Sequence, residues 1–182
     1  MKSESTPTRK APTAPLKNEK SVNITIVGVG NEFRGDDGAG ILAVRMLKEK
    51  VPADVRTAEL AGDQSGLLEL MRSSDALVII DAVRSSAAAG TIFRVDASED
   101  PMPEHFFSFS THAFDSAHAV ELARTLKLLP RRVIFYGIVG KEFSYSSGLT
   151  QEVTESVNLI QTNIQNEIKA ALQREAPVED DA

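Results

Sequence analysis

Three acidic residues and one histidine in this sequence stand at places where chemistry could occur. Asp36 and Asp37 follow an apolar run and a Gly-x-Gly turn in the stretch ITIVGVGNEFRGDDGAG, and Asp81 directly follows the apolar run ALVII. His112 comes after an irregular, proline-containing stretch and shortly before a predicted helix. Two carboxylates and an imidazole are a suitable ligand set for a divalent ion, with open positions for water or a substrate atom. These residues therefore predict a metal-recognising site if the fold gathers them.

Each of these residues also has a purely structural reading. An aspartate at the start of a helix commonly caps the helix or interacts with its dipole, and this reading is stronger for Asp36 than for Asp37. A carboxylate at the end of a buried strand must be solvated, paired or ligating, which favours a functional role for Asp81. The residue pattern does not choose among the three histidines, which are His105, His112 and His118.

Alternating apolar runs and helical patterns predict one α/β domain. The expected strands span 22–27, 54–60, 76–80, 91–95 and 133–139, and the expected helices span 37–50 and 67–71, with two more beginning after Asp115 and Thr150. This order favours a three-layer α/β/α fold, with a twisted, mostly parallel five-stranded sheet and helices on both faces. The strand at 91–95 is expected to run antiparallel, because the connection before it is short for a crossover helix.

The expected topology brings the candidate residues to one place. In open α/β sheets, ligands bind beyond the carboxyl ends of the strands. The acids that follow the first and third strands are then expected at the same edge, and His112 can reach it from the start of its helix. Helical spacing also predicts the buried faces of two helices, which are Ala39, Leu42, Ala43 and Met46 in one and Ala119, Leu122, Ala123 and Leu126 in the other.

The two ends of the chain differ from the domain between them. Residues 1–20 are rich in Pro, Thr, Ser and Lys and have no apolar h-region, which predicts a disordered basic tail rather than a secretory signal. Residues 174–182 predict a disordered acidic tail, which leaves a domain of residues 21–173. The net charge of −6 argues against binding to nucleic acid, and no apolar run approaches the length that spans a bilayer. We expect a cytoplasmic protein, and a monomer because the apolar face of the last predicted helix is expected to pack in the core.

Other chemistries fit the sequence less well. Gly28 and Gly30 begin like a dinucleotide-binding fingerprint, but Phe33 stands where the third glycine belongs. Two acids also occupy the place where a pyrophosphate needs positive potential. The sequence has no Walker loop, no HExxH helix and no GxSxG elbow. The absence of cysteine excludes a Cys nucleophile and a Cys-ligated metal.

The stretch GVGNEFRGDDGAG, followed by IIDAV and then by STHAFD, resembles the hydrogenase maturation protease family. These endopeptidases trim the C-terminal extension from the large subunit of [NiFe] hydrogenases. The resemblance covers roughly residues 22 to 172 and implies the same single twisted sheet with one antiparallel strand. It implies that a metal-binding trio falls on Asp37, Asp81 and His112, and it thereby chooses among the histidines. Asp36 would then be a helix cap or a support.

The resemblance also implies an unusual reaction. The metal would be nickel that is already inserted in the large-subunit precursor, and the protease would recognise it as a checkpoint. The precursor is thus the expected partner, and the nickel arrives with this substrate. Cleavage would follow from polarisation of the scissile carbonyl or activation of a water molecule, with one carboxylate acting as base.

One segment departs from the family pattern. Many members carry an Asp-Gly-Gly-Thr-like turn after the second strand, whereas this chain reads AELAGDQSG, with Ala61 in the place of the acid. Asp63 and Glu59 are the candidates to replace that acid. The departure leaves the hydrogenase subclass open.

Two other functions remain open from the sequence. The same scaffold could serve as a non-catalytic metal-sensing or chaperone module, which would bind a client without changing its mass. It could also be a small-molecule hydrolase or nucleotide enzyme that uses the same edge of the sheet, although that reading rests on fold-level analogy alone.

Overall fold

The computed structural model describes residues 22–61, 65–107, 115–146 and 148–174 of the chain. The strands are β1 (Ile24–Val29), β2 (Arg56–Leu60), β3 (Ala76–Val83), β4 (Ile92–Asp96) and β5 (Arg132–Val139). The helices are α1 (Ala39–Leu47), α2 (Ser65–Ser73), α3 (Ser116–Thr125) and α4 (Gln151–Arg174), with two short 3-10 turns, η1 (Gly35–Gly38) and η2 (Glu104–Phe106). The strands form one sheet in the order β2-β1-β3-β5-β4, in which β4 runs antiparallel to β5 and the other pairs are parallel. The predicted fold class and the antiparallel strand are confirmed.

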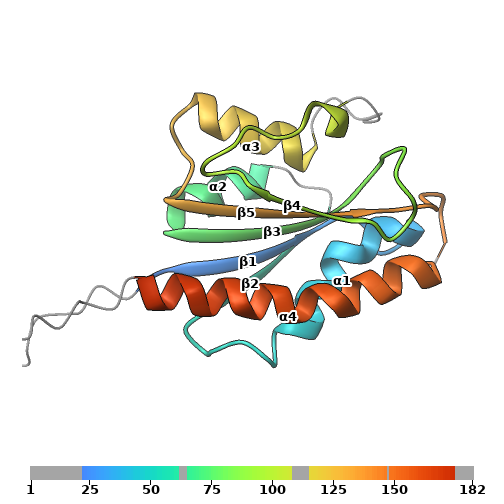
Figure 1. Ribbon diagram of the computed structural model, residues 1–182, viewed down its shortest axis with the longest axis horizontal. Helices are drawn as coiled ribbons and strands as arrows, with labels where there is room; N and C mark the ends of the chain where they lie inside the picture. Colours follow the sequence, from blue (N-terminus) through green and yellow to red (C-terminus); the bar gives the residue numbers. More distant parts are fainter. Residues whose placement is uncertain (1–21, 62–64, 108–114, 147, 175–182) are drawn as a thin grey trace, which may run out of the picture.

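Helices cover both faces of the sheet (Figure 1). α1 and α4 pack on one face, against side chains such as Ile26 and Ile80, while α2 and α3 pack on the other, against side chains such as Val27 and Ile79. Successive strand residues point to opposite faces. Because both faces are covered, β1 and β3 are buried along nearly their whole length, as central parallel strands are. These two cores fix the positions of the residues at the strand ends.

The structure corrects the predicted buried faces of two helices. In α1, Leu42 is 37% exposed and Val44 lies in the core instead. In α3, Leu122 is 36% exposed and Val120 lies in the core instead, while Leu126, the residue that follows the helix, is 53% exposed. Small and apolar residues occupy much of the circumference of both helices, so the helical period fits more than one face and packing on the sheet decides between them. The remaining predicted positions are buried or partly buried, namely Ala39, Ala43, Met46, Ala119 and Ala123.

The first helix also begins later than predicted. Gly35–Gly38 forms the 3-10 turn η1, and the α-helix proper follows it. Gly40 lets this helix cross directly above the sheet, since a Cβ on Gly40 would lie 2.4 Å from the carbonyl oxygen of Val29 and 2.3 Å from that of Ile80. No side chain fits in such a space. Glycine here therefore allows η1 and the start of α1 to sit immediately against the ends of β1 and β3.

The predicted basic tail lies outside the described residues, and so do residues 175–182 of the predicted acidic tail. α4 continues through Arg174. Among the helices of the described ranges, none combines the length and the apolar character needed to cross a membrane.

Candidate active site

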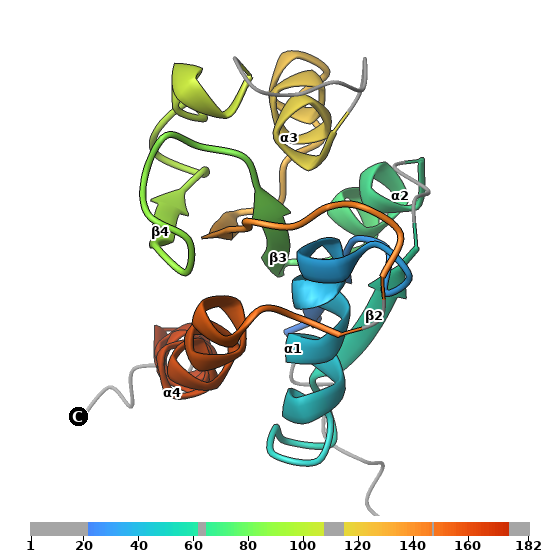
Figure 2. The ribbon, with the colours of Figure 1, turned by 90° about the vertical axis from the view of Figure 1, so that its right-hand side faces the viewer.

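The carboxyl ends of the parallel strands lie at one edge of the sheet, and Figure 2 shows this edge from the front. The turn before α1, the end of β3 and the loop that follows β5 come together there. Ligands bind at this edge in open α/β sheets, because the connections there diverge and leave side chains accessible. The acids predicted from the sequence are found at this edge.

Asp36 ties the turn before α1 to the loop after β5. Its side chain is fully buried. One carboxylate oxygen, Oδ2, accepts hydrogen bonds from the backbone amides of Lys141 and Glu142 at 2.8 and 2.9 Å, and Oδ1 accepts one from the Thr150 amide at 2.7 Å. Burial acts to raise the pKa of Asp36, but these hydrogen bonds together hold the pKa below its ordinary value. Asp36 is thus an ionised structural support, and it does not act as a helix cap, since Arg34 occupies the N-cap position of η1.

Asp81 lies within β3, whereas the sequence predicted it at the strand end. The strand continues to Val83, and Asp81 is in register with Gly137 of β5. The residue is only 8% exposed, and its Oδ2 accepts a hydrogen bond from the hydroxyl of Ser116, the first residue of α3. A central strand and a helix start therefore hold this carboxylate in a defined place.

Asp37 lies half-buried in η1, close enough to Asp81 for the two charges to interact. Burial raises the pKa of Asp81 well above its ordinary value; the Ser116 hydroxyl opposes this rise, and the negative charges of Asp37 and Asp115 add to it. The fold therefore brings the two predicted carboxylates together.

Two of the three histidines have structural partners. His105 packs between aromatic rings, with ring centroids 5.1 Å from Phe93 and 4.6 Å from Phe106. His118 lies in the first turn of α3, where its backbone amide and ring Nδ1 both contact the carboxylate of Asp115, at 2.9 and 2.8 Å. Asp115 is thus the N-cap that the sequence predicted. His112, the predicted ligand, lies outside the described residues.

The chemistry of the predicted donors fits a divalent ion. Imidazole suits nickel, zinc, copper and iron, and carboxylates complete such a set with hard oxygen donors. Within the part of the chain that the structure describes, no group of three or more histidine, aspartate or glutamate side chains is arranged to hold a metal. The described residues thus provide two members of the predicted trio, Asp37 and Asp81, at one edge.

Glu59, one of the two acids that could replace the missing acid of the family pattern, is paired with an arginine. The carboxylate of Glu59 accepts hydrogen bonds from Nε and Nη2 of Arg45, at 3.0 and 2.9 Å. The same guanidinium also binds Glu32, with Nη1 at 2.8 Å. Glu59 is therefore part of an exposed cluster of ion pairs with Arg45 and Glu32. The other candidate, Asp63, lies outside the described residues.

Two hydroxyl residues at the site have roles that the sequence did not indicate. Thr150 was predicted to cap α4, and its carbonyl does accept the Thr154 amide at 3.0 Å, as the N-cap position requires. Its hydroxyl, however, donates to Asp36. Ser116 was not anticipated as the partner of Asp81. Hydroxyl residues are common at helix starts for local reasons, and their partners here are 114 and 35 residues away in the sequence, so no local pattern could reveal them.

Comparison with known proteins gives a consistent result. A family model described as hydrogenase maturation protease (HycI) matches residues 43–167. This range includes Asp81 and His112 and begins shortly after the turn that carries Asp37. A Methanocaldococcus jannaschii protein that carries the name of a hydrogenase maturation protease is 33% identical over 159 residues, which make up 82% of this chain and 99% of that protein.

Solved structures share the fold. The [NiFe] hydrogenase maturation protease HybD from Thermococcus kodakarensis superposes with a TM-score of 0.59 and 28% identity, covering 80% of this chain and 99% of that chain. The hydrogenase maturating endopeptidase HybD from E. coli superposes with a TM-score of 0.65 and 24% identity, covering 85% of this chain and 94% of that chain. At the lower identity the likeness concerns the fold alone.

Proposed function

Since this chain belongs to the hydrogenase maturation protease family, we propose that it removes the C-terminal extension of a [NiFe] hydrogenase large-subunit precursor after nickel insertion. Asp37, Asp81 and His112 are the residues proposed to meet the nickel. The precursor is the proposed partner, the cytoplasm the proposed compartment, and a monomer the proposed working form.

One observation carries the proposal for the site. Asp37 and Asp81 come from η1 and from β3, two elements that contact each other at the edge where open α/β sheets bind ligands. Carboxylates are the hard oxygen donors that divalent ions take in proteins. Two such donors at the edge where open α/β sheets bind ligands support a role for Asp37 and Asp81 in meeting the nickel.

The proposed reaction treats nickel as part of the substrate, because it is carried by the precursor. Contact between the trio and this nickel would bring the scissile peptide bond to the edge of the sheet. Hydrolysis adds one water molecule across the peptide bond, so that the carbonyl carbon gains a hydroxyl group and the nitrogen leaves as an amine. A carboxylate of the site can take a proton from the attacking water and return it to the leaving nitrogen.

Intact mass spectrometry of the precursor tests the proposal. The nickel-loaded precursor is incubated with the wild-type protein and with three variants, Asp37→Asn, Asp81→Asn and His112→Gln. We expect the wild type to remove the extension and each variant to leave the precursor at its full mass. His105→Gln is the matched control, because this histidine packs among aromatic rings and is expected to leave cleavage intact.

A nickel-free precursor provides the second arm of the test. It is expected to remain at full mass with every protein, including the wild type. Normal trimming by both the Asp81 and the His112 variants would rule out the proposed trio. Metal-dependent binding of the precursor by the wild type with no loss of mass would instead favour a non-catalytic metal-sensing module.

A further inference from the structure

A buried serine contacts one carboxylate of the proposed site. Ser116 is 2% exposed, and its hydroxyl donates a hydrogen bond to Oδ2 of Asp81. The two residues come from different layers of the fold, Ser116 from α3 and Asp81 from β3. Since a hydroxyl removed from water needs a hydrogen-bond partner, this contact is part of how the two layers fit together.

Both partners of this hydrogen bond are held by regular structure. Asp81 is flanked in the sheet by β5, with Gly137 in register. Ser116 is the first residue of a helix whose N-cap, Asp115, accepts the His118 amide at 2.9 Å. The Ser116 hydroxyl is thus presented to the carboxylate from a fixed direction rather than from a mobile loop.

We infer that Ser116 is a positioning residue for Asp81. The Ser116 hydroxyl holds Oδ2 of the Asp81 carboxylate and thereby sets the orientation in which the second oxygen, Oδ1, meets the substrate. The inference rests on the proposed function. The terminal torsion of an aspartate is broad, so a carboxylate without this bond samples more orientations. Functional groups work best when a supporting shell holds them to within about 0.5 Å. Loss of such an outer partner typically costs roughly 10–100-fold in metal affinity or activity.

The alternative is a purely structural role, in which Ser116 only provides a hydrogen-bond donor for the buried carboxylate of Asp81. The chain offers a matched comparison for this reading. Ser74 is 9% exposed, and its hydroxyl donates to the buried hydroxyl of Thr25 at 2.8 Å. Ser74 lies just before β3, separated from it by Asp75, and Thr25 lies near the start of β1, so this hydrogen bond is at the opposite end of the strands from the site. Removing either serine hydroxyl breaks one buried hydrogen bond, but only one of the two lies at the proposed site.

The experiment compares four variants of the full chain, Ser116→Ala, Ser116→Thr, Ser116→Cys and Ser74→Ala. The kcat and KM for cleavage of the nickel-loaded precursor are measured for each, with the fraction of folded protein taken from thermal melting. We expect Ser116→Ala to lower kcat roughly tenfold, with KM within about twofold of wild type because substrate contacts are retained. Ser116→Thr keeps the hydroxyl and is expected to recover most of kcat. Ser74→Ala is expected to keep the wild-type kcat.

The outcomes separate the inference from the proposed function. Equal kcat values for Ser116→Ala and Ser74→Ala would overturn the inference while leaving the proposed function in place. If Ser116→Ala does not fold, Ser116→Cys replaces it, because a thiol is close in size but a weak donor, and the same loss of kcat is expected. A wild-type protein that leaves the loaded precursor uncut would overturn the proposed function, and the inference with it.

Discussion

The carboxylate of Asp36 accepts hydrogen bonds from both the backbone amide and the hydroxyl of Thr150, at 2.7 and 3.0 Å, although 114 residues separate the two in the sequence. The adjacent Asp37 lies instead near Asp81 and raises the pKa of that residue by its charge. Asp36 and Asp37, although adjacent in the sequence, therefore have different roles. Asp36 joins the loop after β5 to the turn before α1, and Asp37 belongs to the proposed site.

Substitution of these two acids is expected to separate stability from activity. Asp36→Ala leaves backbone amides of the loop after β5 without their acceptor and is expected to lower the free energy of unfolding by on the order of 3 kcal/mol. Asp37→Ala is expected to lower it by less than Asp36→Ala does, because Asp37 is only half-buried, while abolishing cleavage of the loaded precursor. Urea denaturation and intact mass measure the two effects. Equal losses of stability in both variants would contradict this division of roles.

The sequence predicted the scaffold because the signals for it are local. Continuous apolar runs identify buried parallel strands such as β1 and β3, and the glycine-rich turn before α1 identifies a sharp strand-to-helix junction. The positions of Asp37 and Asp81 then follow from topology, since parallel strands deliver their carboxyl ends to one edge. The short connection before β4 was enough to predict its antiparallel direction, which the structure confirms.

The remaining features depend on contacts that no local pattern encodes. Helical spacing placed Leu42 and Leu122 in the core, but both are exposed, because the sheet selects the buried face of a helix that is apolar or small on several sides. The extension of β3 past Asp81 depends on pairing with β5. The partners of Asp36 and Asp81 are also distant in sequence, so Thr150 and Ser116 could only be identified from the structure.

Asp81→Asn is expected to stabilise the protein at neutral pH. Burial, with the charges of Asp37 and Asp115 adding to it, raises the pKa of Asp81 well above its ordinary value. The folded state then binds the proton more tightly than the unfolded state, so stability falls as the pH rises from about 4 through the raised pKa. Asparagine removes the charge and keeps an acceptor for Ser116. We expect urea denaturation at pH 7.5 to show a gain on the order of 1–2 kcal/mol.

The pH dependence provides the control for this variant. The gain from Asp81→Asn is expected to shrink as the pH falls and to approach zero below about pH 3, where the wild-type carboxyl is protonated in both the folded and the unfolded state. A gain that is constant from pH 4 to pH 7.5, or a loss of stability at pH 7.5, would show that the charge of Asp81 is not what destabilises the wild type.

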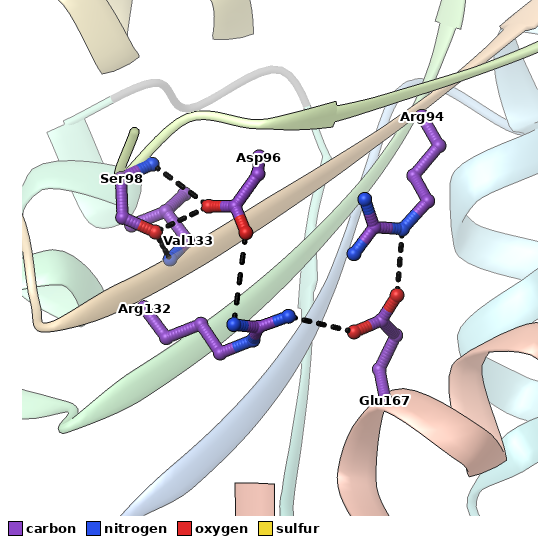
Figure 3. A network of polar contacts seen from close by, with 6 residues as sticks. All are labelled: Arg94, Asp96, Ser98, Arg132, Val133 and Glu167. Atoms are coloured by element: carbon purple, nitrogen blue, oxygen red, sulfur yellow. Dashed lines mark hydrogen bonds and ion pairs between the residues drawn. The ribbon is translucent and has the colours of Figure 1, made fainter. Parts of the chain in front are cut away.

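A second acid, Glu167 of α4, is expected to stabilise the fold through two arginines of the sheet (Figure 3). Its carboxylate contacts Arg94 Nε at 2.6 Å and Arg132 Nη2 at 3.3 Å, and Arg132 also contacts Asp96 at 3.6 Å. Glu167→Gln is expected to lower the free energy of unfolding at pH 7 by roughly 1–3 kcal/mol, because two charge-assisted contacts are weakened while Glu167 and Arg132 lie mostly out of solvent. Urea denaturation measures the change.

The contribution of Glu167 is also expected to disappear in acid. Burial acts to raise the pKa of Glu167, but the hydrogen bonds and charges of Arg94 and Arg132 hold it below its ordinary value. Such a group stabilises the fold above the unfolded pKa of about 4.3 and loses this effect as the pH falls through the lower folded pKa. The difference between wild type and Glu167→Gln should therefore narrow below about pH 4. Glu152→Gln is the control on the same helix, since its ion pair with Lys141 is exposed and is expected to matter little.

Two exposed aromatic residues, here called the aromatic pair, lie on neighbouring loops beside the proposed site. Phe33 and Tyr145 are 68% and 87% exposed. Their loops are joined by a parallel bridge between Arg34 and Ser146, with the Gly35 amide donating to the Ser146 carbonyl at 3.1 Å and the Ser146 amide donating to the Phe33 carbonyl at 3.2 Å. Each aromatic residue directly precedes one of the two bridged residues, so the bridge holds the two positions close together.

The aromatic pair is expected to contribute to binding of the precursor, because exposed aromatic side chains on a rigid support are the residues that most often dominate protein interfaces. The double variant Phe33→Ala/Tyr145→Ala should raise KM for the loaded precursor by roughly tenfold, while kcat stays within about twofold because Asp37 and Asp81 are untouched. Leu159→Ala is the matched control, since this leucine is 66% exposed on α4, and should leave both constants unchanged. An unchanged KM in the double variant, or an equal rise in the Leu159 control, would show that the pair does not meet the substrate.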